Sequence, residues 1–220
     1  MPCFLHLKNG FVDDCFNCQS TCHYHGCDKK NMGHKYCSKR CRKRAYNELT
    51  KCDCVWCTYW KRLGVTGGVA IVLLQKEGND VSSLICLENS GRYQGKYNIT
   101  TGKVDPIDNG CRINTCCREL YEELNILITP RNLIKRLKFT WKHDDTAVVV
   151  LEFDRINIVK KNREIQIRNN DEDLPKTYRE IQKVSYVDIK TMVSPECNIE
   201  YTDYARDILK KLNEEFVYNL

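Results

Sequence analysis

No apolar run in this 220-residue sequence is long enough to cross a membrane. The longest, residues 67–74, is far shorter than the ~20 residues that a transmembrane helix needs. The first residues also lack the basic-then-apolar pattern of a secretory signal peptide, and we find no internal repeat or low-complexity tract. We therefore expect a protein of the cytoplasm, or alternatively of the nucleus, with no membrane partner.

Cysteine, in contrast, is abundant and unevenly placed. Ten of the fifteen cysteines lie in residues 1–57, together with four of the five histidines. Without a secretory signal, clustered cysteines are more often metal ligands than disulfides. Residues 1–62 contain little that can form an apolar core, and bound metal can stabilise a segment of that size. The sequence therefore predicts a zinc-binding module over residues 1–62.

Cysteine spacing predicts two structural Zn²⁺ sites in this module. One site uses two pairs at knuckle spacing, and its ligands are Cys15, Cys18, Cys37 and Cys41. A second site draws on the other cysteines, with candidate ligands Cys22, Cys27, Cys52, Cys54 and Cys57. His23, His25 and His34 are possible substitutes as ligands, although each is alternatively an ordinary polar loop residue. The second cysteine pair of the first site, with Tyr36 and Ser38 beside it, resembles treble-clef and MYND-type zinc fingers.

The five later cysteines have no such spacing. We expect them to be small buried apolar side chains: Cys86, Cys111, Cys116, Cys117 and Cys197.

Charge divides the chain at the same place. Residues 1–62 hold twelve Lys and Arg against five Asp and Glu, a formal +7, whereas the remainder holds twenty-three against twenty-four, a formal −1. A basic module suggests a polyanionic partner such as nucleic acid. The alternative is an ordinary solvated surface.

Beyond residue 62 the pattern is that of an α+β domain, predicted to span residues 63–220. Hydrophobic periodicity predicts strands at residues 69–74, 81–87, 137–141, 146–153 and 184–189, and helices at residues 112–124 and 201–216. We expect Pro130 to end any helical structure, and the polar residues 154–177 to form a long loop or insertion.

Three glutamates crowd one face of the helix predicted at residues 112–124. Glu119, Glu122 and Glu123 follow a spacing of i, i+3 and i+4, at which like charges repel. Such a set favours a divalent cation, because Mg²⁺ is commonly shared between a few carboxylates and substrate phosphates. Arg118, four residues before Glu122, can brace one carboxylate. The alternative is an exposed acidic helix with solvated charges.

The stretch Arg118–Glu123, Arg-Glu-Leu-Tyr-Glu-Glu, resembles the second half of the Nudix hydrolase signature, and residues 102–105, Gly-Lys-Val-Asp, resemble its start. Four features depart from the family pattern. The loop is two residues longer, Asp108 stands at the midway glutamate, Thr100–Thr101 replace Pro-Gly, and Asn125 replaces the final glycine. Asparagine tolerates the left-handed conformation that a helix end requires.

The resemblance covers about residues 65–215 and implies a Nudix α/β/α sandwich with a mixed sheet. It implies that Mg²⁺ or Mn²⁺ is held by Glu119, Glu122, Glu123 and the carbonyl oxygen of Gly102. Arg118 would orient a carboxylate. Either Glu119 or Glu180 would be the general base, although Glu180 is alternatively a solvated loop residue. Lys103 would contact a phosphate or be an ordinary surface lysine.

Three functions follow. The first is hydrolysis of capped mRNA, since the chain resembles decapping-type Nudix enzymes of large DNA viruses; it would then act in the host cytoplasm. The second is hydrolysis of a small nucleoside diphosphate derivative, such as a dinucleotide, nucleotide sugar or diphosphoinositol phosphate. The third is non-enzymatic: a zinc finger interaction protein with a degenerate Nudix fold. The sequence leaves the oligomeric state open.

Overall fold

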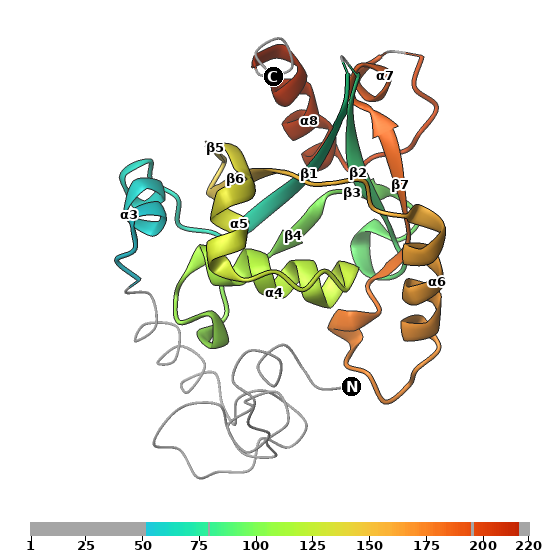
Figure 1. The fold of residues 1–220 in the computed structure, drawn as a ribbon, viewed down its shortest axis with the longest axis horizontal. Coiled ribbons are helices and arrows are strands. Elements are labelled where there is room, and N and C mark those ends of the chain that lie inside the picture. Colours follow the sequence, from blue (N-terminus) through green and yellow to red (C-terminus); the bar gives the residue numbers. More distant parts are fainter. Residues whose placement is uncertain (1–51, 79, 195, 216–220) are drawn as a thin grey trace.

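A seven-stranded mixed sheet forms the centre of the computed structural model, which describes residues 52–78, 80–194 and 196–215 (Figure 1). Its strands are β1 (Val69–Glu77), β2 (Asp80–Glu88), β3 (Tyr97–Asn98), β4 (Thr100–Gly102), β5 (Leu137–His143), β6 (Thr146–Glu152) and β7 (Ile181–Asp188). The strand order is β3-β2-β1-β6-β5, with β4 also paired to β1 and β7 to β2. β1 and β6 run parallel and the other pairs antiparallel. The predicted mixed sheet is confirmed.

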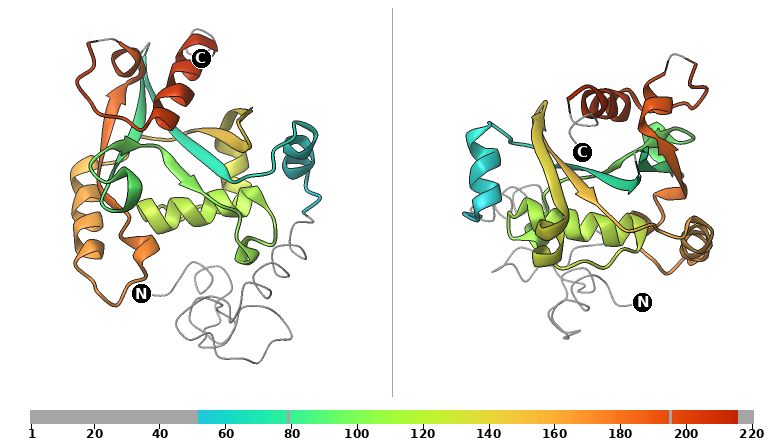
Figure 2. Two further views of the ribbon diagram at one scale, coloured as in Figure 1. Left: turned by 180° about the vertical axis from the view of Figure 1, so that it is seen from behind. Right: turned by 45° about the horizontal axis from the view of Figure 1, so that its top comes forward.

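The helices are α3 (Val55–Arg62), α4 (Arg112–Leu124), α5 (Pro130–Arg136), α6 (Ile158–Asn169), α7 (Ile189–Val193) and α8 (Asp203–Glu215), with 3₁₀ turns η1 (Gly91–Tyr93), η2 (Pro106–Asp108) and η3 (Lys176–Tyr178). α4 and α8 lie on opposite sides of the sheet, as Figures 1 and 2 show. Within the described ranges, no helix has the length and apolar character that a membrane span requires.

An apolar core lies on each face of the sheet, one between the sheet and α4 and the other between the sheet and α8. Both cores include residues of β1, because successive residues of a strand point to opposite faces. Ile71 of β1 joins the core that contains Leu120 of α4. Its neighbours Ala70 and Val72 join the second core, which contains Ile208 of α8. β1 is buried along nearly its whole length, as expected for a strand covered on both faces. The α+β class and the α/β/α sandwich predicted from the sequence are therefore confirmed.

α3 was not predicted, and it packs against the α4 side of the sheet. Trp60 is completely buried in that core, and its Nε1 donates a hydrogen bond to Thr140 Oγ1 at 2.7 Å. The predicted boundary after residue 62 coincides with the end of α3. Most of the predicted zinc module, including Cys15, Cys18, Cys22, Cys27, Cys37 and Cys41, lies outside the described residues. The boundary therefore stays a prediction.

Two predictions about the second half of the chain are wrong. Pro130 begins α5, where a proline at the first helical position needs no N–H, and Thr129 caps the helix by accepting from Asn132 N at 3.3 Å. Residues 154–177 are not one long loop, because they contain α6. The buried residues of α6 include Lys161 and Arg168. Polar residues on the inner face therefore hid its helical period.

The end of α4 shows the conformation that the sequence requires. Asn125 is its C-cap, with φ 52° and ψ 38° in the left-handed region. Its N–H donates to the carbonyls of the last turn of α4. Asparagine thus takes the part that glycine usually plays at a helix end.

We expect Asn125→Ala to lower the free energy of unfolding by about 1–2 kcal/mol, because alanine pays the full cost of the left-handed conformation. Asn125→Gly is the matched control. It also removes the side chain but tolerates this conformation, so it should stay within about 0.5 kcal/mol of the parent. Urea unfolding of both variants measures the difference. Equal losses would show that the side-chain contacts of Asn125, and not its backbone, matter here.

Candidate functional site

The guanidinium of Arg118 on α4 is the centre of a buried polar network. Its Nε and Nη2 donate to the two carboxylate oxygens of Asp108, each at 3.0 Å. Its Nη1 lies 2.7 Å from Glu119 Oε1 and 2.8 Å from Glu122 Oε2. Nη2 also donates to the backbone carbonyl of Lys103 at 2.9 Å. One cation therefore orients three carboxylates and one loop carbonyl.

Asp108 ties the loop after β4 to α4. It is 1% exposed. Besides Arg118, it accepts from the backbone N–H of Asp105 at 2.8 Å and from the Thr115 hydroxyl at 3.0 Å. It closes η2 as part of a capping box. The shorter acid at the midway position of the signature thus reaches Arg118, because η2 brings its backbone close to the helix.

Glycine is required where β4 ends against α4. A Cβ atom on Gly102 would overlap the carboxylate of Glu119, and one on Gly68 would overlap the carbonyl of Gly102. Gly102 also pairs with Val69 of β1. Gly102, whose carbonyl oxygen the resemblance marks as a metal ligand, is therefore in direct contact with Glu119, one of the three glutamates of α4.

The three glutamates of α4 do not form an exposed acidic face, so that alternative is wrong. Glu119, Glu122 and Glu123 are only 8%, 4% and 7% exposed. Burial, together with the charges of Glu122 and Asp108, raises the pKa of Glu119 to about 8 even though Arg118 opposes the shift. Burial also raises the pKa of Glu123 well above its usual value, helped by the charge of Glu119. The carboxylates repel one another in a poorly solvated place.

Two further carboxylates join this group from the edge of the sheet. Glu180 lies half-buried just before β7, and its pKa is raised by burial and by the charges of Glu88 and Glu122. Glu88, at the end of β2, is also half-buried, accepts from Asn98 Nδ2 at 2.9 Å, and has a pKa raised by burial. Both Glu88 and Glu180 contribute to the raised pKa of Glu123.

Sequence reasoning identified Glu180 but missed Glu88. No motif marks Glu88; its only signal is a carboxylate directly after the apolar residues of a buried strand. The side chain of Lys103 is exposed, and only its backbone carbonyl takes part in the network around Arg118.

A separate group of side chains is made of cysteines. The Sγ atoms of Cys52, Cys54, Cys57 and Cys111 all lie within 4.8 Å of one another. In the part of the chain that the structure describes, this is the one group of three or more His, Cys, Asp or Glu ligand atoms gathered so closely. The carboxylates of α4 are less tightly gathered, and Glu119 and Glu122 are each paired with Arg118.

The prediction that Cys111 is a buried apolar side chain is therefore wrong. It is half-buried at the N-cap of α4, and a hydrogen bond from the Cys57 thiol, aided by nearby backbone N–H groups, lowers its pKa to about 5. Cys86, Cys116 and Cys117 are buried as predicted, whereas Cys197 is half-buried. The signal that sequence reasoning overlooked is that Cys111 lies directly before a helix, at the end of the loop that joins β4 to α4 (the signature loop, residues 103–111).

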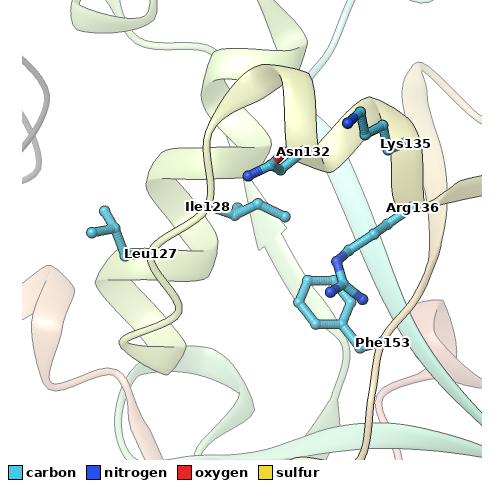
Figure 3. A pocket seen from close by; sticks show the side chains of 6 residues that line it. All are labelled: Leu127, Ile128, Asn132, Lys135, Arg136 and Phe153. Carbon is cyan, nitrogen blue, oxygen red and sulfur yellow. The ribbon is translucent and has the colours of Figure 1, made fainter.

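A pocket of about 460 Å³ lies beside α5 and is not part of either group. Figure 3 shows its lining: Leu127, Ile128, Asn132, Lys135, Arg136 and Phe153. The Arg136 guanidinium lies 4.8 Å from the centre of the Phe153 ring. None of the predicted site residues lines this pocket.

Several solved structures resemble the arrangement of this chain. A Nudix hydrolase from Alicyclobacillus acidocaldarius shares 13% identity, covering 66% of this chain and 89% of its own, with a TM-score of 0.44. The Nudix domain of Shewanella oneidensis NrtR, complexed with ADP-ribose, shares 10% identity over 66% and 84%, with a TM-score of 0.43. A C. elegans Ap4A hydrolase shares 13% identity over 66% and 93%, with a TM-score of 0.40. No family model and no curated protein matches the sequence.

The contact between Gly102 and Glu119 makes a testable prediction. Gly102→Ala should lower the free energy of unfolding by about 1–3 kcal/mol, because the new methyl group overlaps the Glu119 carboxylate. Glu119→Ala removes the atoms that it would meet. In the double variant Gly102→Ala/Glu119→Ala the penalty of the alanine at 102 should largely disappear, as measured by a double-mutant cycle in urea. Strictly additive effects would contradict the contact.

Proposed function

We propose that this protein is a Nudix hydrolase that cuts a diphosphate linkage in a nucleoside diphosphate derivative with the help of Mg²⁺ or Mn²⁺. The observation that carries the proposal is the set of five carboxylates around α4: Glu88, Glu119, Glu122, Glu123 and Glu180. Burial raises the pKa of Glu119, Glu123 and Glu180, and in each case the charges of other members of the set add to the shift. Perturbed carboxyl groups that converge from several elements are typical of functional sites.

The donor set fits a hard divalent cation. Carboxylate and carbonyl oxygens are its preferred ligands, and buried carboxylates that repel one another are stabilised by added positive charge. Bound cations would neutralise the diphosphate and lower the pKa of a water molecule. We assign Glu119, Glu122, Glu123 and the carbonyl of Gly102 as ligands, with Glu88 as an additional acidic partner.

The remaining residues position these groups or move the proton. Arg118 holds Glu119 and Glu122 in place and, through Asp108, fixes the loop that carries Lys103. Two residues remain candidates for the general base, Glu119 and Glu180. Lys103 is exposed, which suits either a contact with a substrate phosphate or a plain surface role.

Glu122→Gln tests the site. The change keeps the size of the side chain but removes the charge that pairs with Arg118, so we expect hydrolysis to fall about 100-fold or more while the circular dichroism spectrum stays unchanged. Glu172→Gln is the matched control, because Glu172 is exposed on the loop before η3. A Glu122→Gln rate equal to that of the control would refute the assignment of the site.

We favour capped mRNA as the substrate. The formal +7 of residues 1–62 supports a polyanionic partner, and the signature resembles that of decapping-type Nudix enzymes. A small nucleoside diphosphate derivative is the alternative. A non-enzymatic role is disfavoured, because all three glutamates of α4 are present and buried, and Glu119 lies against Gly102.

A product assay with Mg²⁺ separates the two substrates. Capped RNA and a panel of dinucleotides, nucleotide sugars and diphosphoinositol phosphates are offered to the full chain, with Glu122→Gln as the blank. Release of methylated GDP supports decapping. Turnover restricted to the small compounds would establish the alternative, and turnover of none of them would contradict both.

RNA binding gives an independent measure of the same choice. If the basic module contacts RNA phosphates, the logarithm of affinity should fall steeply with the logarithm of salt concentration. Replacing Arg42, Lys43 and Arg44 with glutamine should reduce that slope by up to about 2, since each phosphate contact in a single strand contributes about 0.7. A matched triple change of Lys160, Arg163 and Lys183 should leave it unaltered. Equal slopes for the parent chain and both variants would argue against an RNA-binding module.

A further inference from the structure

We propose that Cys52, Cys54, Cys57 and Cys111 bind one structural zinc ion, which joins the segment around α3 to the N-terminus of α4. Sequence reasoning combined Cys52 and either Cys54 or Cys57 with Cys22 or Cys27. Cys111 instead supplies the fourth ligand, from the far side of the signature loop. The proposed zinc is therefore part of the domain that carries the acidic helix.

The sulfur positions match the geometry of a four-cysteine zinc site. With Zn–S bonds of about 2.3 Å, the corners of a tetrahedron lie about 3.8 Å apart. The Sγ atoms of Cys54 and Cys57 each lie 4.0 Å from Cys111 Sγ, and all four sulfurs lie within 4.8 Å of one another. No pair among the four is joined in a disulfide. An ion at the centre needs only small side-chain adjustments.

Backbone groups around the cluster favour thiolates. The N–H of Cys57 donates to Cys54 Sγ at 3.4 Å, and the N–H of Arg112 donates to Cys57 Sγ at 3.4 Å. Cys54 is the N-cap of α3 and Cys111 is the N-cap of α4. Helix N-termini stabilise negative charge, and hydrogen bonds to a charged group favour its charged form. Both effects suit the excess negative charge of a zinc ion with four thiolates.

The alternative, four cysteines that merely fill space, fits the arrangement poorly. Cys116 and Cys117 show what apolar cysteines look like here, since both are 0% exposed in the core. Cys52, Cys54 and Cys111 are only half-buried, yet their sulfurs point at one another from segments more than fifty residues apart in the chain. Sulfurs that converge at a partly open position are better explained by a shared ligand.

The zinc would hold α4 in place. The ion would cross-link Cys57 to Cys111. The chain between these two residues contains β1, β2 and the signature loop. The same corner is strengthened by Arg112, whose guanidinium donates to the carbonyls of Val65 and Gly67 at 3.3 and 2.9 Å. The N-terminus of α4 is thus anchored to α3 and to the start of β1.

Metal analysis of the full chain, purified under reducing conditions, tests the proposal. Cys111→Ser should contain one zinc equivalent fewer per chain than the parent protein. Cys197→Ser, a half-buried cysteine outside the cluster, is the matched control and should retain the parent zinc content. An unchanged zinc content in folded Cys111→Ser, or iron in place of zinc, would overturn the proposal. Zinc content is measured without any substrate, so the result is independent of the proposed hydrolase activity.

Alkylation of the unaltered protein keeps the test valid if Cys111→Ser does not fold. We expect Cys52, Cys54, Cys57 and Cys111 to resist a thiol reagent together, and to become labelled together after a zinc chelator is added. Cys197 should be labelled under both conditions, as read by peptide mass spectrometry. Labelling of the four cysteines at the same rate with and without chelator would refute a bound metal.

Discussion

The ion cluster around Arg118 is the interaction on which the rest of the site depends. A single guanidinium, 7% exposed in its side chain, lies within 3.0 Å of carboxylate oxygens of Asp108, Glu119 and Glu122. Removing charges from water is costly, and the attraction between them offsets the cost only when the geometry is good and the hydrogen bonds are satisfied. Here one cation serves several carboxylates, so negative charge remains in excess. This arrangement orders three carboxylates around one guanidinium.

Three separate contacts fix the position of α4, the helix that carries this cluster. Its N-terminus meets the cysteine group, where Cys57 Sγ accepts from the N–H of Arg112. Its middle is bound to the signature loop through Asp108 and Arg118. At its end Arg168 of α6 donates to two carbonyls of the last turn, at 3.2 and 2.8 Å. Cationic side chains are favourable at the C-terminus of a helix. The position of α4, and of the glutamates that it carries, is therefore fixed at both ends of the helix.

Gly68, directly before β1, and Gly102, at the end of β4, matter because they leave space for their neighbours, not because they are flexible. Neither Gly68 nor Gly102 has a positive φ, yet a Cβ at either position would overlap its neighbour. The lack of a side chain lets β1, β4 and α4 approach one another closely, with Glu119 against Gly102 and the Gly102 carbonyl against Gly68. In the signature loop that follows β4, η2 brings Asp108 back to Arg118.

Local features of the chain were determined by the sequence itself. The bounds of α4, Arg112–Leu124, match the predicted helix, and Asn125 takes the left-handed conformation expected of it. Two other features can also be recognised from neighbouring residues alone: the continuous apolar run at the start of β1 and the spacing of the three glutamates. Only the tertiary structure decided that Glu88 joins the acids and that Cys111 joins the cysteines. Both lie far in sequence from their partners, and periodicity and motif spacing report only on neighbours along the chain. Their association depends on the register of the sheet and on the packing of α3 and α4, which bring distant segments together.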